Sequence, residues 1–454
     1  MVYLKTAARR LLVLPYYCNY LEPEPLSSNL ACRTMLYNYL PNALQYLLAT
    51  YIFTPQVTTP GPLRFGLRHE FGLTNSSRPV FSNIHAASQL TYDAYEITTQ
   101  RTPTYRPRNQ DAFFRSRHFS SEARRELGWE ETELEGPDVN DRETLLMLAK
   151  MTANAYSRPG QKDWYDLGPD WNNSYPFGWE PDSDGFRGHI FATEDNSTVI
   201  ISVKGTSAGW VVGGGGPTTR KDKLNDNLLF SCCCARVGPT WSPVCDCYRG
   251  NYKCDQNCLE KSLVDDSLFY PVGTNLYNNV TYLYPDANIW VIGHSLGGSL
   301  ASLLGVTFGV PVVAFEAVGE KLAAQRLHLA LPPSLQHITH VYNTGDPIAM
   351  GTCTGVASTC AIGGFALETG CHLGKVIRYD TVTHLKWSVH IGNHGIAVVI
   401  DHLLSKEWAY DNVEGGENRT VPALTEEEGC VDCYNWEYGD FEKSLDGPSC
   451  GLRD

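Results

Sequence analysis

Short apolar runs alternate with helical patterns from about residue 198 onward. Runs typical of buried strands occupy residues 198–203, 288–292, 311–315 and 338–342. Small and apolar residues at helical spacing fill residues 299–308, end at Gly309, and recur near 319–329. Because strands that alternate with helices form parallel sheets covered on both faces, this pattern predicts an α/β fold with a mostly parallel sheet.

The first third of the chain is less regular. Residues 54–137 are rich in Pro, Ser, Thr, Arg and aromatic residues without a sustained period, whereas residues 141–156 predict a capped amphipathic helix. The most apolar stretch near the N-terminus, residues 40–53, is interrupted by polar residues and is short for a membrane span. We expect four parts: an N-terminal segment with a degenerate signal or anchor (1–60), an irregular arm (61–137), the α/β domain (138–412) and an acidic tail with cysteines (413–454).

The segment VIGHSLGGSLASLLG, residues 291–305, joins a predicted strand to a predicted helix through a Gly-x-Ser-x-Gly turn. A strand, a sharp turn and a helix form the nucleophile elbow of hydrolases, which predicts that Ser295 is a nucleophile. Glycine is expected at Gly293 and Gly297, on either side of His294 and the serine, because the turn is tight and the helix packs close to the strand. The alternative is a glycine-rich turn that carries a solvated serine.

A nucleophilic serine needs a histidine base and a carboxylate that orients the histidine, in the chain order Ser, Asp or Glu, His. Asp346 directly follows the predicted strand 338–342, at the sheet edge where α/β proteins place their sites. We therefore expect Asp346 to be the carboxylate, with turn formation as its alternative role. Asp380 and Asp401 are the other candidates.

The sequence does not single out one histidine as the catalytic base. The histidines that follow the predicted carboxylate are His372, His384, His390, His394 and His402. Two of them, His390 and His394, lie just before an apolar, helix-like run at residues 396–400. The sequence pattern alone leaves these two as competing candidates for the base.

An oxyanion requires two hydrogen-bond donors. The N–H of Leu296, next to the nucleophile, is expected to be one of them. The second is expected from the loop after the strand 198–203, where Thr206 offers its N–H and its hydroxyl. The segment that follows, residues 210–217 with the sequence WVVGGGGP, predicts either a mobile lid over the site or a flexible surface loop.

Cysteines and glycosylation sequons indicate an oxidising compartment of the secretory pathway. Thirteen of the fifteen cysteines follow residue 230. Five sequons begin at Asn75, Asn172, Asn196, Asn279 and Asn418. A zinc site within residues 245–258 is the alternative, but the spacing departs from the usual paired C-x2-C, so we expect disulfides and no metal.

The net charge of −14 argues against a nucleic-acid partner. It also provides no general attraction to anionic membranes, so contact with lipid would be local and apolar. We expect no cofactor, and the sequence does not determine an oligomeric state.

Several segments together resemble the class 3 lipases. The resemblance rests on the elbow segment, with VKGTSAG upstream of it and NTGDP downstream. It narrows to the fungal autophagy-related vacuolar lipases through LRHEFG, DRETLLMLAKMTANAY, DNLLFSCCCARV, FGVPVVAFEAVGEKLAAQRL and CVDCYNWEYGDF, and covers roughly residues 65–440. Class 3 lipases commonly carry a Gly-x-Pro-Arg-x-Gly-like segment where this chain has residues 315–319, FEAVG, and that departure matches the autophagy-related branch.

The resemblance implies an α/β-hydrolase fold and a triad of Ser295, Asp346 and His394, which favours His394 over His390. It implies a serine lipase or phospholipase that hydrolyses membrane glycerolipid esters in the vacuole lumen and lyses autophagic and multivesicular-body vesicles. It also implies delivery through endosomal and multivesicular-body membranes by a single N-terminal anchor, as a type II protein. The alternatives are a secreted carboxylesterase acting on small or polysaccharide esters, and a lipid-binding protein on a decayed hydrolase fold.

Overall fold

The computed structural model describes residues 63–73, 79–83, 96–118, 127–157, 161–165, 185–206, 218–235, 243–266, 269–410 and 419–441. The chain divides into two units, residues 1–60 and 61–454. The described stretches all belong to the second unit, so the N-terminal segment expected to hold a signal or anchor lies outside them. Among the helices that the structure describes, none combines the length and the apolar character needed to cross a membrane.

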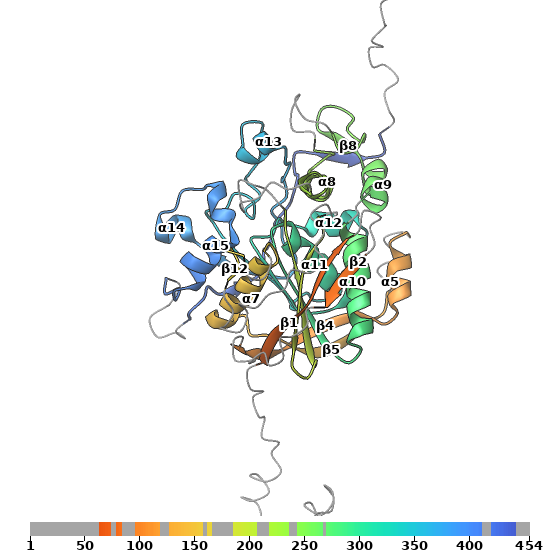
Figure 1. Cartoon of the computed structure of the whole chain (residues 1–454). Helices are drawn as coiled ribbons and strands as arrows, with labels where there is room; N and C mark the ends of the chain where they lie inside the picture. Colours follow the sequence, from red (N-terminus) through yellow and green to blue (C-terminus); the bar gives the residue numbers. More distant parts are fainter. Residues whose placement is uncertain are drawn as a thin grey trace, which may run out of the picture. The chain divides into compact units, whose positions relative to one another are not determined.

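A ten-stranded mixed sheet forms the centre of the second unit, in the order β13-β12-β11-β10-β9-β7-β6-β1-β2, with β3 paired to β1 (Figure 1). The parallel strands are β7 (Thr198–Val203), β9 (Asn288–His294), β10 (Val312–Phe315), β11 (Ile338–Asn343) and β12 (Lys375–Tyr379). The antiparallel strands at the two edges are β13 (Leu424–Thr425), β6 (Gly188–Thr193), β1 (Leu63–Leu73), β2 (Pro79–Asn83) and β3 (Glu96–Ile97). The predicted α/β fold with a mostly parallel central sheet is confirmed.

Helices cover both faces of the sheet (Figure 1). Successive strand residues point to opposite sides, so the apolar strands contribute side chains to a hydrophobic core on each face. In β9, Val291 packs in one core, and Trp290 and Ile292 pack in the other. The first core is completed by α8 (Thr219–Phe230), α10 (Phe269–Leu283), α11 (Leu296–Phe308) and α12 (Lys321–Arg326). The second core is completed by α7 (Arg142–Asn154), α15 (Ile396–Val398) and the helical turn η4 (Val399–Leu404). Both faces of the central strands are therefore buried, as their continuous apolar runs predicted.

The segment that we expected to be an irregular arm supplies strands instead. Strand β1 joins the central sheet antiparallel to β6, and its register shifts between Leu67 and His69. The shift places Phe65 in one hydrophobic core and Phe71 in the other, although an unbroken strand would put residues six apart on the same face. A bulge of this kind interrupts the two-residue period, which explains why the pattern did not predict the strand.

Two longer strands of the same segment form a separate ribbon. Strands β4 (Thr99–Pro107) and β5 (Trp129–Pro137) pair along their full length, and helix α5 (Gln110–Ser116) lies between them in the sequence. The indole N–H of Trp290 donates to Glu135 O at 2.8 Å and ties the ribbon to the central sheet. The helix predicted at residues 141–156 is confirmed as α7, whose N-cap Asp141 accepts a hydrogen bond from Thr144 N at 2.9 Å.

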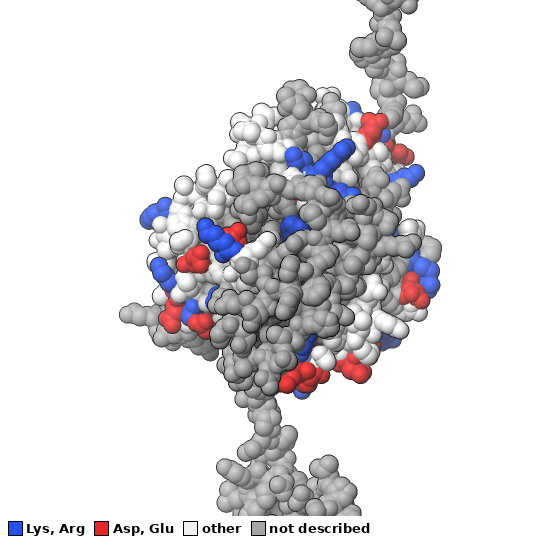
Figure 2. Space-filling model, in the orientation of Figure 1, with Lys and Arg blue, Asp and Glu red and all other residues white. Residues whose placement is uncertain are grey.

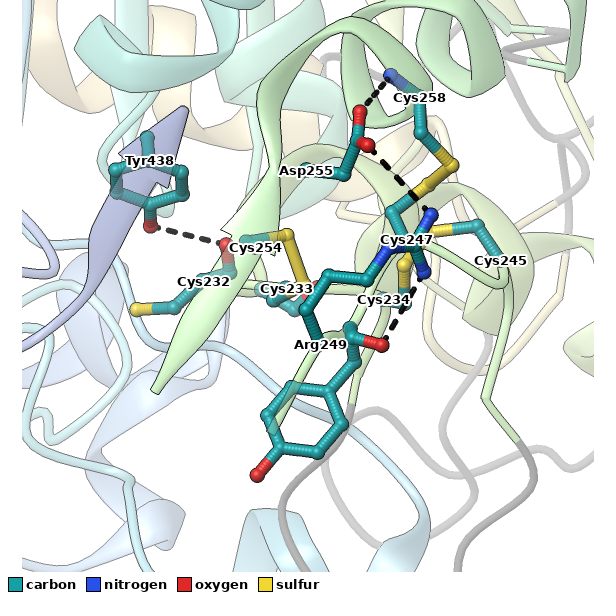
Figure 3. The surroundings of a disulfide bond; sticks show 12 residues. Cys232, Cys233, Cys234, Cys245, Cys247, Arg249, Cys254, Asp255, Cys258 and Tyr438 are labelled. Carbon is teal, nitrogen blue, oxygen red and sulfur yellow. Dashed lines mark hydrogen bonds and ion pairs between the residues drawn. A yellow bond between two sulfur atoms is a disulfide. The ribbon is translucent and has the colours of Figure 1, made fainter. Parts of the chain in front are cut away.

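Six disulfides connect the described cysteines, which confirms the expected disulfides. Figure 3 shows those formed among the cysteines of residues 233–258. The pairs are Cys232–Cys433, Cys233–Cys254, Cys234–Cys245, Cys247–Cys258, Cys353–Cys360 and Cys371–Cys430. Two of them join the tail to the body, over sequence separations of 201 and 59 residues. The tail also adds β13 to the sheet and pairs β14 (Glu437–Gly439) with β8 (Lys253–Asp255).

An ion pair between the buried His372 and the partly buried Glu427 reinforces the attachment of the tail. Glu427 accepts hydrogen bonds from His372 Nδ1 at 3.1 Å, from His372 N at 2.8 Å and from the Tyr342 hydroxyl at 2.6 Å. Burial works against the charged imidazole, but Glu427 outweighs it and raises the pKa of His372 above the ordinary 6.5. Burial likewise opposes the Glu427 charge, but the bonds from His372 and Tyr342 lower the pKa of Glu427 to about 2. Both partners are thus charged in mildly acidic solution.

The ion pair makes the stability of the tail dependent on pH. Because the folded pKa of His372 is raised, its contribution is complete below about 6.5 and is lost as the pH rises through the folded value. The depressed pKa of Glu427 makes its own contribution complete above the ordinary 4.5 and lost only as the pH falls through about 2. We predict that Glu427→Gln lowers the melting temperature by about 2–4 °C near pH 5.5, and by less than half as much near pH 9.

Calorimetry of the wild type and the variant at both pH values measures this difference. Glu426→Gln is the matched control, because Glu426 pairs with Lys375 at 2.7 Å but its side chain is 62% exposed. The control should change the melting temperature little at either pH. An equal loss for Glu427→Gln at both pH values would show that the charge on His372 does not contribute.

Candidate active site

Ser295 occupies a strained turn between β9 and α11. Its backbone φ is 56°, a conformation that is uncommon for a residue with a side chain. A Cβ at Gly293 would lie 2.3 Å from the carbonyl oxygen of Gly297, and a Cβ at Gly297 would lie 2.3 Å from that of Val203. The two glycines are therefore required by close backbone contacts, and the turn has the geometry of a nucleophile elbow.

The side chains of Ser295, His394 and Asp346 form one chain of hydrogen bonds. Ser295 Oγ donates to His394 Nε2 at 2.9 Å, and His394 Nδ1 donates to Asp346 Oδ2 at 2.7 Å. Ser295 is 6% exposed, His394 2% and Asp346 0%. The structure thus brings together the three residues that the resemblance selected, and the carboxylate holds the imidazole in the tautomer that leaves Nε2 free to accept a proton.

Asp346 lies in the turn after β11, and its charge is balanced by donors around it. Besides His394, the backbone N–H groups of Ile348 and Ala349 donate to its two oxygens at 2.9 and 3.3 Å. Burial alone would raise the pKa of this carboxyl, but the charge and hydrogen bond of His394, with further bonds from Glu316 and Ile348 N, hold it below its usual value. The side chain is consequently kept as a carboxylate in a site without water contact.

The competing candidates have other contacts. His390 is exposed, and its Nδ1 accepts a hydrogen bond from Gly392 N at 3.0 Å. Asp380 caps α14 (Thr381–Leu385) by accepting from Thr383 N at 3.1 Å. Asp401 is exposed on η4. In the part of the chain that the structure describes, none of these three residues is hydrogen-bonded to the Ser295 hydroxyl or to the His394 ring.

His294, at the first variable position of the Gly-x-Ser-x-Gly motif, links the elbow to two neighbouring loops. Its Nε2 donates to His394 O at 2.7 Å, and its Nδ1 accepts from the Tyr156 hydroxyl at 2.7 Å. The Tyr156 oxygen in turn accepts from Gly205 N at 3.0 Å. Burial, with a smaller effect of the nearby His394, lowers the pKa of His294 to about 3, so the ring is neutral and serves as a fixed connector.

The loop after β7 carries Thr206, the residue expected to complete the oxyanion site. The Thr206 hydroxyl donates to Asp226 Oδ2 at 2.6 Å. This contact differs from our expectation that the hydroxyl points to the oxyanion, and it leaves the backbone N–H of Thr206, with that of Leu296, for that role. Asp226 comes from α8, and burial raises its pKa to about 8. The hydrogen bond to the buried Asp226 carboxyl therefore anchors the Thr206 side chain and orients the loop.

A buried lysine fixes the other side of the same loop. Lys204 Nζ donates to Gly205 O at 2.6 Å and lies 3.6 Å from Asp222 Oδ2, with both side chains 1% exposed. Burial lowers the pKa of Lys204 to about 8, although Asp222 opposes the shift. Since the N–H of Gly205 is bonded to Tyr156, both polar groups of this glycine are occupied and the loop has a defined orientation.

Several residues that shape the site were not identified from the sequence. Tyr156 ends a predicted helix, Asp226 begins the segment DNLLFSCCCARV, and Asn343 begins NTGDP directly after a predicted strand, but none of the three was assigned a role. Glu316 did have a signal, because it lies in the FEAVG segment that departs from the usual class 3 pattern. Residues 210–217, which we interpreted as either a lid or a flexible surface loop, lie outside the described residues.

The remaining expectations concern the sequons, the surface charge and the cysteines. Among the sequons, Asn196 and Asn279 are exposed, whereas Asn75, Asn172 and Asn418 lie outside the described residues. On the face shown in Figure 2, acidic and basic side chains of the described residues are interspersed rather than gathered into one basic surface. The twelve described cysteines are joined in disulfides, so their sulfurs are not available as thiolate ligands for zinc.

The chain is similar to known lipases. Residues 266–352 match the family model described as Lipase (class 3). A relative named "Putative lipase ATG15" from Cryptococcus neoformans var. neoformans serotype D is 51% identical over 367 residues, which cover 69% of this chain and 70% of the relative. A relative of the same name from Mycosarcoma maydis is 46% identical over 367 residues, with the same coverage of 69% and 70%.

A solved structure, that of the Lip2 lipase from Yarrowia lipolytica, aligns with a TM-score of 0.26 and 16% sequence identity over 51% of this chain and 76% of that one. The sequence relationships are much closer than this structural match, and they extend over two thirds of the chain. The chain therefore belongs to the family of ATG15 lipases, within the class 3 lipases.

Proposed function

We propose that this lipase is a serine hydrolase that cleaves ester bonds of membrane glycerolipids and phospholipids, with Ser295, His394 and Asp346 as its catalytic residues. The observation that carries the proposal is the hydrogen-bonded chain from Ser295 Oγ through His394 to Asp346, located at a strained strand–helix turn. A solvated serine between glycines would not need a buried imidazole and a buried carboxylate in this order.

The reaction follows from the geometry. His394 Nε2 takes the proton of Ser295 while Ser295 Oγ attacks the ester carbonyl, and Asp346 stabilises the imidazolium that forms. The same imidazolium then gives its proton to the departing alcohol of the lipid. A water molecule then gives a proton to His394 Nε2 and attacks the acyl-enzyme. The fatty acid leaves as the bond to Ser295 Oγ breaks, and His394 returns the proton to Ser295 Oγ.

The oxyanion of each tetrahedral intermediate is stabilised by the backbone N–H groups of Leu296 and Thr206. Leu296 is the first residue of α11, where unpaired N–H groups and the helix dipole favour negative charge. Thr206 is oriented by its hydroxyl bond to Asp226. Preorganised donors of this kind cost no rearrangement when the charge develops.

The compartment and the substrate are inferred from the family and from the chemistry of the chain. Curated relatives are named as ATG15 lipases, and the resemblance seen in the sequence implies action on vesicle membranes inside the vacuole. Six disulfides and two exposed sequons support passage through an oxidising, glycosylating pathway. We therefore propose that the lipase acts in the vacuole lumen, where it lyses autophagic and multivesicular-body vesicles.

Replacing the nucleophile tests the reaction and its substrate. We predict that Ser295→Ala reduces fatty-acid release from phospholipid vesicles and from a soluble short-chain ester by at least about 10⁴-fold in kcat. Ser299→Ala is the matched control, since Ser299 lies one turn away on α11 and its hydroxyl donates to Val318 O at 2.7 Å. The control should stay within about tenfold of the wild type.

The two substrates separate the alternatives. Serine-dependent release from vesicles supports a membrane lipase. Cleavage of the soluble ester without release from vesicles would indicate a small-molecule esterase. No Ser295-dependent release from either substrate would overturn the enzymatic proposal and favour a lipid-binding protein.

Removing the hydroxyl of Thr206 tests its proposed positioning role. We predict that Thr206→Val lowers kcat on the soluble ester by about 10²-fold with little change in KM, because the N–H remains but the loop loses its anchor to Asp226. Thr206→Ser, which keeps the hydroxyl, should recover most of the activity. A decrease of less than about threefold for Thr206→Val would exclude this role.

A further inference from the structure

Glu316 is a fully buried carboxyl residue directly beside the triad, and the mechanism above does not use it. It follows the last residue of β10 and has a φ of 42°, which is unusual for a residue with a side chain. Its N–H donates to Val341 O at 2.9 Å, which fixes this conformation against β11. Strain of this kind at the carboxyl end of a central strand is a common sign of a functional constraint.

The Glu316 side chain has two sets of contacts. Its Oε1 accepts from Asn343 Nδ2 at 2.8 Å and from Asn343 N at 3.1 Å. Its carboxyl is also hydrogen-bonded to the carboxyl of Asp346. Asn343 Nδ2 donates in addition to Asn393 O at 3.1 Å, next to His394. Glu316 therefore contacts the triad carboxylate directly and the histidine loop through one amide.

Two carboxyl groups in such a contact cannot both be ionised in a buried site. Asp346 has three other donors, including the imidazole of His394, so it is the partner that keeps the charge. Burial and the charge of Asp346 raise the pKa of Glu316 well above its ordinary value. Three other titratable groups interact with the pair: His394, which is bonded to Asp346, His294, which burial keeps neutral, and Tyr342, whose hydroxyl donates to Glu427.

We propose that Glu316 is a positioning residue that remains protonated and donates a hydrogen bond to Asp346, so that the triad is extended to a chain of four side chains. The donated bond orients the Asp346 carboxylate toward His394 and disperses its charge. A donor to the charged form makes protonation of Asp346 by solvent less favourable. It also limits how strongly Asp346 stabilises the imidazolium that forms on His394 during the reaction.

This arrangement suits a serine hydrolase that works in an acidic compartment. An ordinary histidine has a pKa near 6.5 and would lose much of its function as a base in acid. A second ionised carboxylate beside Asp346 would aggravate this loss by stabilising the imidazolium. A neutral carboxylic acid at the same position makes the imidazolium less stable, because it donates a hydrogen bond to Asp346 without adding negative charge.

Two substitutions at Glu316 test the assignment, which rests on the proposed triad. Glu316→Gln keeps a donor to Asp346 and an acceptor for Asn343, so it imitates the protonated acid. Glu316→Met has a comparable shape but no donor. The kcat/KM of each variant on a soluble ester is measured from about pH 4 to 9, with the melting temperature recorded alongside.

We define the acid limb as the fall of kcat/KM toward low pH. Glu316→Gln should keep the midpoint of the acid limb within about 0.3 pH units of the wild type. Glu316→Met should shift this midpoint to higher pH by about one unit and lower kcat by about tenfold. Glu320→Gln is the matched control. Glu320 is equally buried, but its carboxylate contacts Ser302 and His340 instead of the triad. The control should leave the position of the acid limb unchanged even if it lowers the melting temperature.

The outcomes distinguish the possibilities. A downward shift of the acid limb by about one unit in Glu316→Gln would show that Glu316 carries a charge in the wild type, and would overturn the proposal. An unchanged limb in a folded Glu316→Met would overturn it as well, because the donor would then be irrelevant. Failure of the triad itself is recognised separately, by activity that persists in Ser295→Ala.

An infrared difference spectrum provides a readout independent of activity and of the Glu316→Met variant. Subtracting the spectrum of Glu316→Gln from that of the wild type near pH 7 should reveal the carbonyl stretch of one protonated carboxyl group. Absence of that band would show that Glu316 is ionised and would contradict the proposal.

Discussion

The buried negative charge of Asp346 is the constraint on which the site depends. A carboxylate without solvent contact is stable only when enough donors surround it. They come from His394, from the backbone of its own turn and, in our proposal, from a protonated Glu316. These groups lie on three segments that are remote in sequence, so the charge is tolerated only when the ends of the central strands are correctly aligned.

The parallel sheet provides this alignment. Strands β9, β10 and β11 are neighbours and run in the same direction, so the residues after them meet at one edge. Ser295, Glu316 and Asp346 follow these three strands in that order. Two of the three have a positive φ, which turns their side chains into the site at a cost in backbone strain. Packing of both faces of the sheet fixes the strand ends and makes this strain tolerable.

A second network holds the loops around this edge. His294 connects the elbow to the histidine loop and, through Tyr156, to the loop that carries Thr206. Because its ring is neutral and buried, its hydrogen bonds do not change over the pH range in which the lipase is proposed to work. The His372–Glu427 pair, which joins the tail to the body, is strongest in mild acid. The residues that support the fold and those that support the site are thus compatible with the same acidic conditions.

The sequence by itself determined the elements with clear periodicity and the chemistry with strict local rules. These include the central strands, the helix at Arg142–Asn154, the elbow around Ser295 and the oxidised cysteines, because local propensity and turn geometry specify them. The choice of His394 over His390 needed the family resemblance. Only the tertiary structure decided the cysteine pairing, the bulged strand β1 and the contacts of Tyr156, Asp226 and Glu316. These features depend on which distant segments the folded sheet brings together, and a one-dimensional pattern does not contain that information.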